Sequence, residues 1–187
     1  MGLPVVGKAH EARRGEPFVW FVYGSSLDRD AFARWADEHG YRVPDFKGAI
    51  VVRLENFRLA FDVRSRFWGG AVASLVEEEG AFVEGIALPV GGDLHALVEH
   101  KEGAISGLYA ATTVTVTPIV KPVPKWSSEK PRELPPFLRA VAYVAAADRR
   151  LPAEEPPSAD FIEAVIRGAK SFGLSKEWLD KLATYRP

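Results

Sequence analysis

An apolar segment from Pro17 to Val22 runs directly into a turn of small residues, which reads Tyr23-Gly24-Ser25-Ser26-Leu27. Glycine permits backbone angles that are closed to other residues, and two serines add little bulk, so successive amide N–H groups can point toward one spot. Such a cradle of backbone donors stabilises an anionic or carbonyl oxygen. The pattern therefore predicts a buried strand that delivers an oxygen-binding loop; the alternative is an ordinary strand-to-helix turn.

A second group with chemical potential lies far downstream. Glu102 and Gly103 stand where a helix-like pattern breaks, shortly before a strand that begins near Tyr109. A partly buried carboxylate has a raised pKa and can both accept and return a proton. From the spacing alone, the alternative is favoured: Glu102 ends a surface helix, where a carboxylate is solvated and the helix dipole opposes its charge.

Together these two segments resemble the γ-glutamylcyclotransferase family, whose members carry Tyr-Gly-Ser-Asn-Leu after the first strand and Glu-Gly before a Gly-x-Tyr strand. The order and spacing fit, and this context favours a catalytic Glu102. The resemblance extends to Phe67-Trp68-Gly69-Gly70 and to a C-terminal run from Pro156 to Leu182. It implies an α+β fold, a small mixed, mostly antiparallel β-barrel flanked by helices.

The resemblance also implies an activity. The α-amine of a γ-glutamyl compound attacks its own γ-carbonyl carbon, which releases 5-oxoproline and a free amine or amino acid without a cofactor or a metal. Glu102 is then the general base and acid, and the small-molecule γ-glutamyl substrate is bound by Tyr23, Gly24, Ser25, Ser26, Leu27 and Tyr109.

Two departures from the family pattern keep an alternative open. Ser26 replaces the family's Asn, and Ala145-Ala146-Ala147 occupies a region where the family often has an aromatic lid residue. These differences put substrate affinity and the identity of the leaving amine in doubt. The alternative function is a non-catalytic protein of the same fold that binds a γ-glutamyl or amino-acid-like ligand.

Other chemistries fit the residues less well. His95, Glu99 and His100 lie near Glu102, but the two histidines fall on different helix faces and no further histidine cluster completes a metal site. Ser25 lacks the second glycine of a nucleophile elbow. The loop is also too poor in glycine and lysine to hold a nucleotide phosphate.

Composition narrows the function classes further. With 187 residues and 47% hydrophobic content, the chain is expected to form a single domain over 1–187, with 1–15 as a flexible extension. A net charge of −1 gives no excess of positive charge with which to bind nucleic acid. The absence of cysteine excludes disulfides, thiolate metal sites and cysteine nucleophiles. The apolar start is short and followed by charges, so we expect a cytoplasmic protein without membrane contact. Glutamine is absent and asparagine occurs once, which is typical of thermophiles.

Periodicity predicts the elements that must position these groups. Asp28 caps an expected helix over 28–39, and further helices are expected over 94–101, 158–172 and 176–183. Strands are expected over 17–22, 109–116 and 137–145, with two short hairpins between them: one over 46–63 broken at Glu55-Asn56, and one over 72–89 with an acidic turn at 77–80. A proline-rich loop over 118–136, carrying Trp126, is an insertion or lid candidate. The family resemblance allows a homodimer, but no apolar heptad pattern demands one.

Overall fold

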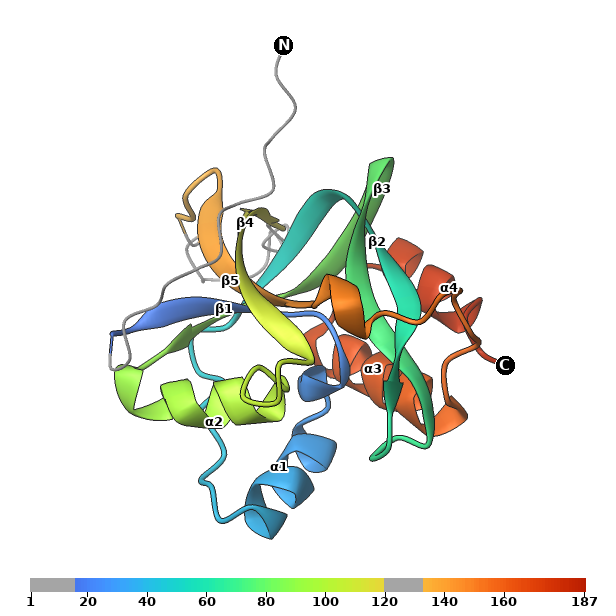
Figure 1. The fold of residues 1–187 in the computed structure, drawn as a ribbon. Coiled ribbons are helices and arrows are strands. Elements are labelled where there is room, and N and C mark those ends of the chain that lie inside the picture. Colours follow the sequence, from blue (N-terminus) through green and yellow to red (C-terminus); the bar gives the residue numbers. More distant parts are fainter. Residues whose placement is uncertain (1–15, 120–132) are drawn as a thin grey trace.

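Five strands close into a barrel in the order β1-β3-β2-β4-β5 (Figure 1). The computed structural model describes residues 16–119 and 133–187; the expected N-terminal extension and the loop residue Trp126 lie outside the described residues. All strand pairs are antiparallel except β1 with β5, which run parallel. The predicted mixed, mostly antiparallel barrel is confirmed. The strands are β1 Phe18–Val22, β2 Ile50–Ser65, β3 Gly70–Val90, β4 Tyr109–Pro118 and β5 Leu138–Ala145.

Helices cover the barrel at one end and along one side. In Figure 1, α1 and α2 lie together at the bottom, whereas α3 and α4 lie on the right. Within the described residues, no helix is long and apolar enough to cross a membrane. The α-helices are α1 Arg29–Glu38, α2 His95–Lys101, α3 Ala159–Phe172 and α4 Lys176–Ala183, and the 3-10 turns are Ser25–Leu27, Gly92–Leu94 and Ala147–Arg149.

The helix ends follow from the capping residues. The Asp28 carboxylate accepts hydrogen bonds from the backbone N–H groups of Asp30 and Ala31 at the start of α1. Ser158 caps α3 in the same way, and Gly173 ends α3 with a left-handed φ of 67°. The helices predicted from these signals are therefore confirmed.

The two short hairpins expected between 46 and 89 are wrong. The chain instead forms one long hairpin of β2 and β3, which turns at 66–69. Asn56, with φ at 61°, accepts a hydrogen bond from the N–H of Gly80 through Oδ1 at 2.9 Å. Glu55 pairs with Phe82 and Phe57 pairs with Glu77, so residues 78–81 bulge out opposite Asn56 alone. The turn-like residues therefore mark a bulge within continuous strands.

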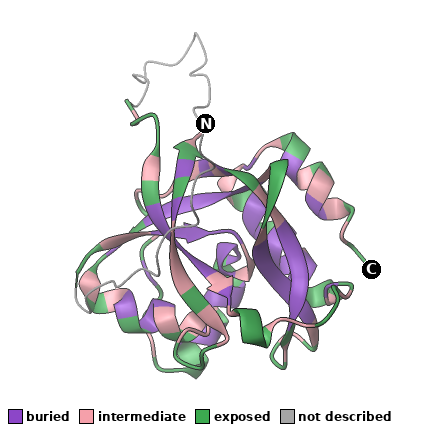
Figure 2. Cartoon of the chain, turned by 45° about the horizontal axis from the view of Figure 1, so that its top comes forward, coloured by how far each residue is buried: buried purple, intermediate pink, exposed green. Residues whose placement is uncertain are grey.

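Aromatic and aliphatic side chains fill the interior of the barrel and the space beneath the helices. Figure 2 shows the buried residues along the middle of the strands, whereas the turns and outer helix faces are exposed. Trp20 of β1, fully buried, contacts Phe32 of α1 with ring centroids 6.2 Å apart. Burial of each such side chain contributes about 1.5–3 kcal/mol. This packing fixes the end of β1, from which the Tyr-Gly-Ser-Ser-Leu loop departs.

Helix α3 supports that loop from behind. A Cβ atom at Gly168 would lie only 2.4 Å from the backbone carbonyl carbon of Leu27, so this helix position accepts nothing larger than glycine. One residue earlier, Arg167 binds the Asp28 carboxylate through Nε at 3.0 Å and Nη2 at 2.7 Å. The loop after β1 is therefore held by a helix that lies about 140 residues later in the chain.

Candidate active site

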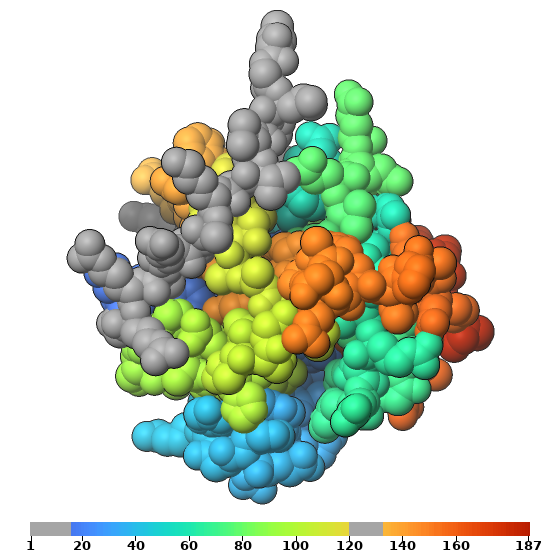
Figure 3. All heavy atoms as spheres, viewed as in Figure 1, coloured from blue at the N-terminus to red at the C-terminus, as the bar shows by residue number. Residues whose placement is uncertain are grey.

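A cavity of about 130 Å³ opens between the loop after β1, the segment after α2 and the tip of the β2–β3 hairpin. In Figure 3 it lies in the hollow between the yellow-green residues that follow α2 and the teal hairpin. Its lining combines polar and apolar side chains. The lining residues are Tyr23, Gly24, Ser25, Ser26, Ser65, Trp68, Val72, Ala73, Lys101, Glu102, Gly103, Leu108, Tyr109 and Phe161.

The carboxyl group of Glu102 is the acid in this cavity. Glu102 forms the C-cap of α2, and Gly103 follows with a left-handed φ of 72°, which ends the helix. The Ser26 hydroxyl donates a hydrogen bond to Glu102 Oε1 at 2.7 Å, and this contact joins residues 76 positions apart in the sequence. Burial raises the pKa of Glu102 above its ordinary value, against the Lys101 charge and the Ser26 hydrogen bond, which lower it. The carboxylate is therefore a stronger base than a solvated glutamate.

Lys101 is a cation beside Glu102 that the sequence analysis did not single out. Its Nζ lies 5.6 Å from the ring centroid of Phe32 and 5.5 Å from that of Trp35, within the range of cation–π attraction. None of the ion pairs in the described part of the chain includes Lys101. Burial lowers the pKa of Lys101, and the neighbouring Glu102 charge opposes this effect.

The loop after β1 forms a single 3-10 turn at the cavity floor. The N–H of Leu27 donates to Gly24 O at 3.1 Å, and the N–H of Asp28 donates to Ser25 O at 3.0 Å. Within the described residues, the N–H groups of Ser25 and Ser26 donate to no protein acceptor, as expected for the first residues of such a turn. These two donors are available to a ligand.

Two members of the loop differ from the sequence-based expectation. Gly24 has φ at −106° and ψ at −149°, so it does not adopt the left-handed backbone conformation that favours glycine. A Cβ atom there would meet nothing within 4 Å, so glycine instead leaves open space in this cavity wall. Leu27 is fully buried and does not line the cavity.

The two tyrosines line the cavity, but their hydroxyl hydrogens are directed at the main chain. Tyr109 donates to Ala73 O at 2.7 Å, and Tyr23 donates to Tyr143 O at 2.5 Å. Burial raises the pKa of Tyr23 and Tyr109, and the Glu102 charge raises both further. Both phenols therefore remain neutral and can offer a ligand only the lone pairs of oxygen.

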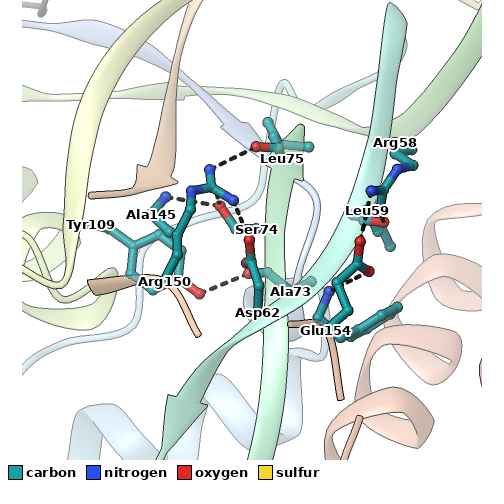
Figure 4. Close-up of polar contacts among 11 residues, drawn as sticks. Arg58, Leu59, Asp62, Ala73, Ser74, Leu75, Tyr109, Ala145, Arg150 and Glu154 are labelled. Carbon is teal, nitrogen blue, oxygen red and sulfur yellow. Dashed lines mark hydrogen bonds and ion pairs between the residues drawn. The ribbon is translucent and has the colours of Figure 1, made fainter. Parts of the chain in front are cut away.

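A polar network next to Tyr109 was not predicted. Arg150 donates through Nη1 to Asp62 Oδ2 at 2.5 Å and through Nη2 to Leu75 O at 3.0 Å (Figure 4). Its Nη2 also lies 3.4 Å from Ser74 Oγ, which accepts from the N–H of Ala145 at 2.8 Å. This network fixes the part of β3 that carries the acceptor of Tyr109. Its sequence signal is weak, because Arg150 lies in a charged, proline-rich connection.

The residues considered for a metal site are not brought together. His95 Nε2 lies 3.6 Å from Glu99 Oε1, whereas His100 Nδ1 faces the hydroxyl of Tyr41 at 3.2 Å. No group of three or more histidine and acidic residues with metal-binding geometry occurs in residues 16–119 and 133–187.

The chain is similar to curated proteins named gamma-glutamylcyclotransferase, although no model of a protein family matches it. The mouse protein (Mus musculus) is 24% identical over 184 residues, covering 96% of this chain and 85% of its own length. The bovine protein (Bos taurus) is 27% identical over 177 residues, covering 92% and 81%.

Solved structures share the fold. A human protein described as uncharacterized superimposes with a TM-score of 0.69 at 23% identity, and a protein named gamma-glutamyl cyclotransferase does so with a TM-score of 0.66 at 23% identity. Each similarity covers 92% of this chain and 89% of the other. The sequence similarity to these curated proteins, together with the shared fold, therefore supports a γ-glutamylcyclotransferase-like family assignment.

Proposed function

We propose that the protein cyclises γ-glutamyl amines or amino acids to 5-oxoproline, with Glu102 as both general base and general acid. The observation that carries the proposal is the hydrogen bond from Ser26 to the Glu102 carboxylate at the cavity. Burial of this carboxylate raises its pKa. The similarity to curated gamma-glutamylcyclotransferases supports the same reaction class.

The proposed reaction moves two protons, one after the other, from the α-ammonium group to the departing nitrogen, with Glu102 as the carrier. At neutral pH the α-amine is an ammonium group, so Glu102 first accepts a proton from it. The free amine attacks the γ-carbonyl carbon, and a five-membered ring closes through a tetrahedral oxyanion. Glu102 then returns this proton to the departing nitrogen as the bond between that nitrogen and the carbonyl carbon breaks. Glu102 next accepts the second proton from the ring nitrogen, which becomes a neutral lactam N–H, and passes it to the released amine, which leaves as an ammonium ion. The products are 5-oxoproline and the free amine, and no water is consumed.

The loop after β1 is the proposed stabiliser of the oxyanion. The N–H groups of Ser25 and Ser26 are unengaged within the described residues, and both serines line the same cavity as Glu102. Preorganised donors of this kind are typically worth 10²–10³ in rate each. The replacement of the family's Asn by Ser26 leaves these backbone donors in place and gives Glu102 a hydroxyl partner.

The test is 5-oxoproline release from a panel of γ-glutamyl amino acids and amines, measured at 25 °C and hot because the composition is typical of thermophiles. Glu102→Gln keeps the size and the acceptor for Ser26 but removes the titrating group. We expect turnover to fall about 100- to 10,000-fold, the usual contribution of general acid–base catalysis. The matched control is Glu99→Gln on the same helix, which does not line the cavity and is expected to retain full turnover.

Each outcome assigns a function. Turnover that survives Glu102→Gln would keep the reaction and discard Glu102 as the base. Calorimetric binding of γ-glutamyl compounds without turnover at any temperature would favour the alternative, a non-catalytic ligand-binding protein. Ser26 and the alanines after β5, which depart from the family pattern, are the observations that favour that alternative.

A further inference from the structure

We propose that Trp68, together with Phe161, forms a leaving-group subsite that selects γ-glutamyl substrates whose amine carries an aromatic or large aliphatic group. The inference rests on the proposed function, because it assigns the second half of the same cavity. Trp68 lies between Phe67 and Gly69 in the turn of the β2–β3 hairpin, and it lines the cavity.

The lining is chemically divided. Of the described residues that line the cavity, only Lys101 and Glu102 are charged, and they adjoin one another at the end of α2. Trp68 comes from the β2–β3 hairpin and Phe161 from the first turn of α3. The charged glutamyl group of a substrate can therefore pair with charged side chains at the end of α2. The leaving group, on the other side of the scissile bond, then contacts the aromatic rings of Trp68 and Phe161.

The position of Trp68 is fixed by its surroundings. Its backbone N–H donates to Ser65 Oγ at 3.2 Å, and its ring meets that of Phe161 edge-on, with centroids 5.7 Å apart at 78°. An edge-to-face pair of this kind is a favoured aromatic geometry. Phe161 itself is buried, with 4% of its surface exposed, so it cannot swing away.

The start of β3, directly after the hairpin turn, is held against the N-terminus of α3. A Cβ atom at Gly70 would lie 2.9 Å from Ser158 Cβ, and the N–H of Ser158 donates to Ala71 O at 3.1 Å. The tip that carries Trp68 and the helix that carries Phe161 therefore form one support. A rigid subsite discriminates between ligands better than a mobile one, because less ordering is needed on binding.

The size of the cavity places the leaving group at this wall. Pockets that enclose a drug-sized ligand measure about 300–1,000 Å³, whereas this cavity measures about 130 Å³. It can enclose the glutamyl group but not a whole dipeptide. The leaving group must then extend past the half-buried Trp68 toward solvent. The segment after β5, where the family often has an aromatic lid, lines no part of the cavity, so the aromatic surface comes from the hairpin instead.

The experiment compares kcat/KM for γ-glutamyl-phenylalanine, γ-glutamyl-alanine and γ-glutamyl-aspartate. We expect the wild type to prefer phenylalanine over alanine by about tenfold or more, the discrimination that an apolar pocket provides. Trp68→Ala should reduce this ratio below about threefold, because kcat/KM for the phenylalanine substrate falls more than kcat/KM for the alanine substrate. Phe137→Ala, which removes an exposed aromatic ring that does not line the cavity, is the matched control and should leave the ratio unchanged.

A thermal melt checks that each variant folds, and Trp68→Leu replaces Trp68→Ala if the alanine variant does not. An equal kcat/KM for phenylalanine and alanine substrates in the wild type would overturn the subsite and leave the proposed function standing. A preference for the phenylalanine substrate that persists in the Trp68 variant would also overturn the subsite and leave the proposed function standing.

If no substrate yields 5-oxoproline, the proposed function fails, and calorimetric Kd values of the same compounds test the subsite instead. Tighter binding of γ-glutamyl-phenylalanine that Trp68→Ala abolishes would support the subsite. Equal Kd values for the three compounds would refute it.

Discussion

Glu84 and Glu102, two glutamates in the described part of the chain, differ in their partners. Glu84 in β3 is fully buried and accepts hydrogen bonds from Arg53 Nη2 and from the N–H of Ser175, both at 2.8 Å. Glu102 has one neutral donor, Ser26, and opens onto a cavity. A carboxylate with a cation and a backbone donor is satisfied and structural. A carboxylate with fewer partners retains the capacity to accept a proton.

The contacts around Glu84 explain its structural role. Ser175 is the N-cap of α4, so Glu84 joins the start of that helix to the barrel. The guanidinium of Arg53 also lies 3.8 Å from the ring centroid of Phe82 and 3.5 Å from Glu177 Oε2. The whole group lies on the side of the barrel that faces α4, and none of its members lines the cavity.

Glu84→Gln should produce the largest effect on stability. The change removes the charge that Arg53 pairs with, and hydrogen bonds to charged groups contribute about 1.5–3 kcal/mol. We expect the free energy of unfolding, measured by denaturant titration, to fall by about 2–3 kcal/mol. Turnover per folded molecule should stay at the wild-type value. A loss of turnover as large as that of Glu102→Gln would contradict the division between the two glutamates.

The pH dependence of turnover sharpens the comparison. Because the folded-state pKa of Glu102 is raised, the residue becomes protonated, and unable to act as a base, at a higher pH than a solvated glutamate. The rate should therefore fall about tenfold per pH unit below that pKa. Initial rates of 5-oxoproline release give the profile, and circular dichroism confirms that the protein stays folded. An acid limb at or below the ordinary glutamate pKa of about 4.3 would contradict the assignment.

Ser26→Ala should move that acid limb upward. The Ser26 hydrogen bond lowers the pKa of Glu102, so its removal raises the pKa further. We expect a higher apparent pKa in the rate profile and a loss of turnover within about tenfold, as for one lost hydrogen bond. Ser171→Ala, which removes a hydroxyl bonded to Gly168 O on α3, is the control for loss of a serine hydroxyl. An acid limb at the same pH as in the wild type would show that Ser26 does not influence the pKa of Glu102.

The smallest effect is expected for the stability of Glu102→Gln. With the folded-state pKa of Glu102 above the unfolded value, ionisation is less favourable in the folded protein, so stability falls as pH rises from the unfolded pKa through the folded pKa. Replacement by Gln removes this loss. The variant should equal or exceed the wild type in thermal stability at neutral pH, and its advantage should shrink at low pH. A marked destabilisation at neutral pH would indicate that Glu102 is structural, like Glu84.

Local signals predicted the helices and the outline of the site, because they act over a few residues. Asp28, Ser158 and Gly173 mark helix ends by capping chemistry alone. The prediction of two short hairpins was wrong for a related reason. Asn56 and Gly80 are residue types that favour turns, but here they form a bulge within two paired strands.

The aromatic wall could not be predicted in the same way. Whether Trp68 faces the cavity or solvent depends on contact with Phe161, which lies more than 90 positions away and has no sequence relation to it. The tyrosine hydroxyls were expected near substrate, but they bond to main-chain carbonyls that only the folded barrel brings into reach. Residue types were readable from the chain, whereas side-chain directions were not.

The close contact of Gly168 with the backbone of Leu27 has a consequence for how the protein is made. The loop with Ser26 is synthesised early, yet the helix that supports it leaves the ribosome only after residue 168 has been added. Contacts between such distant segments form late in folding. During translation, the part of the chain that carries both Ser26 and Glu102 therefore exists for some time without a finished pocket. A ribosome-bound nascent chain that stops before α3 would contain every proposed catalytic group and still lack the support that holds the loop in place.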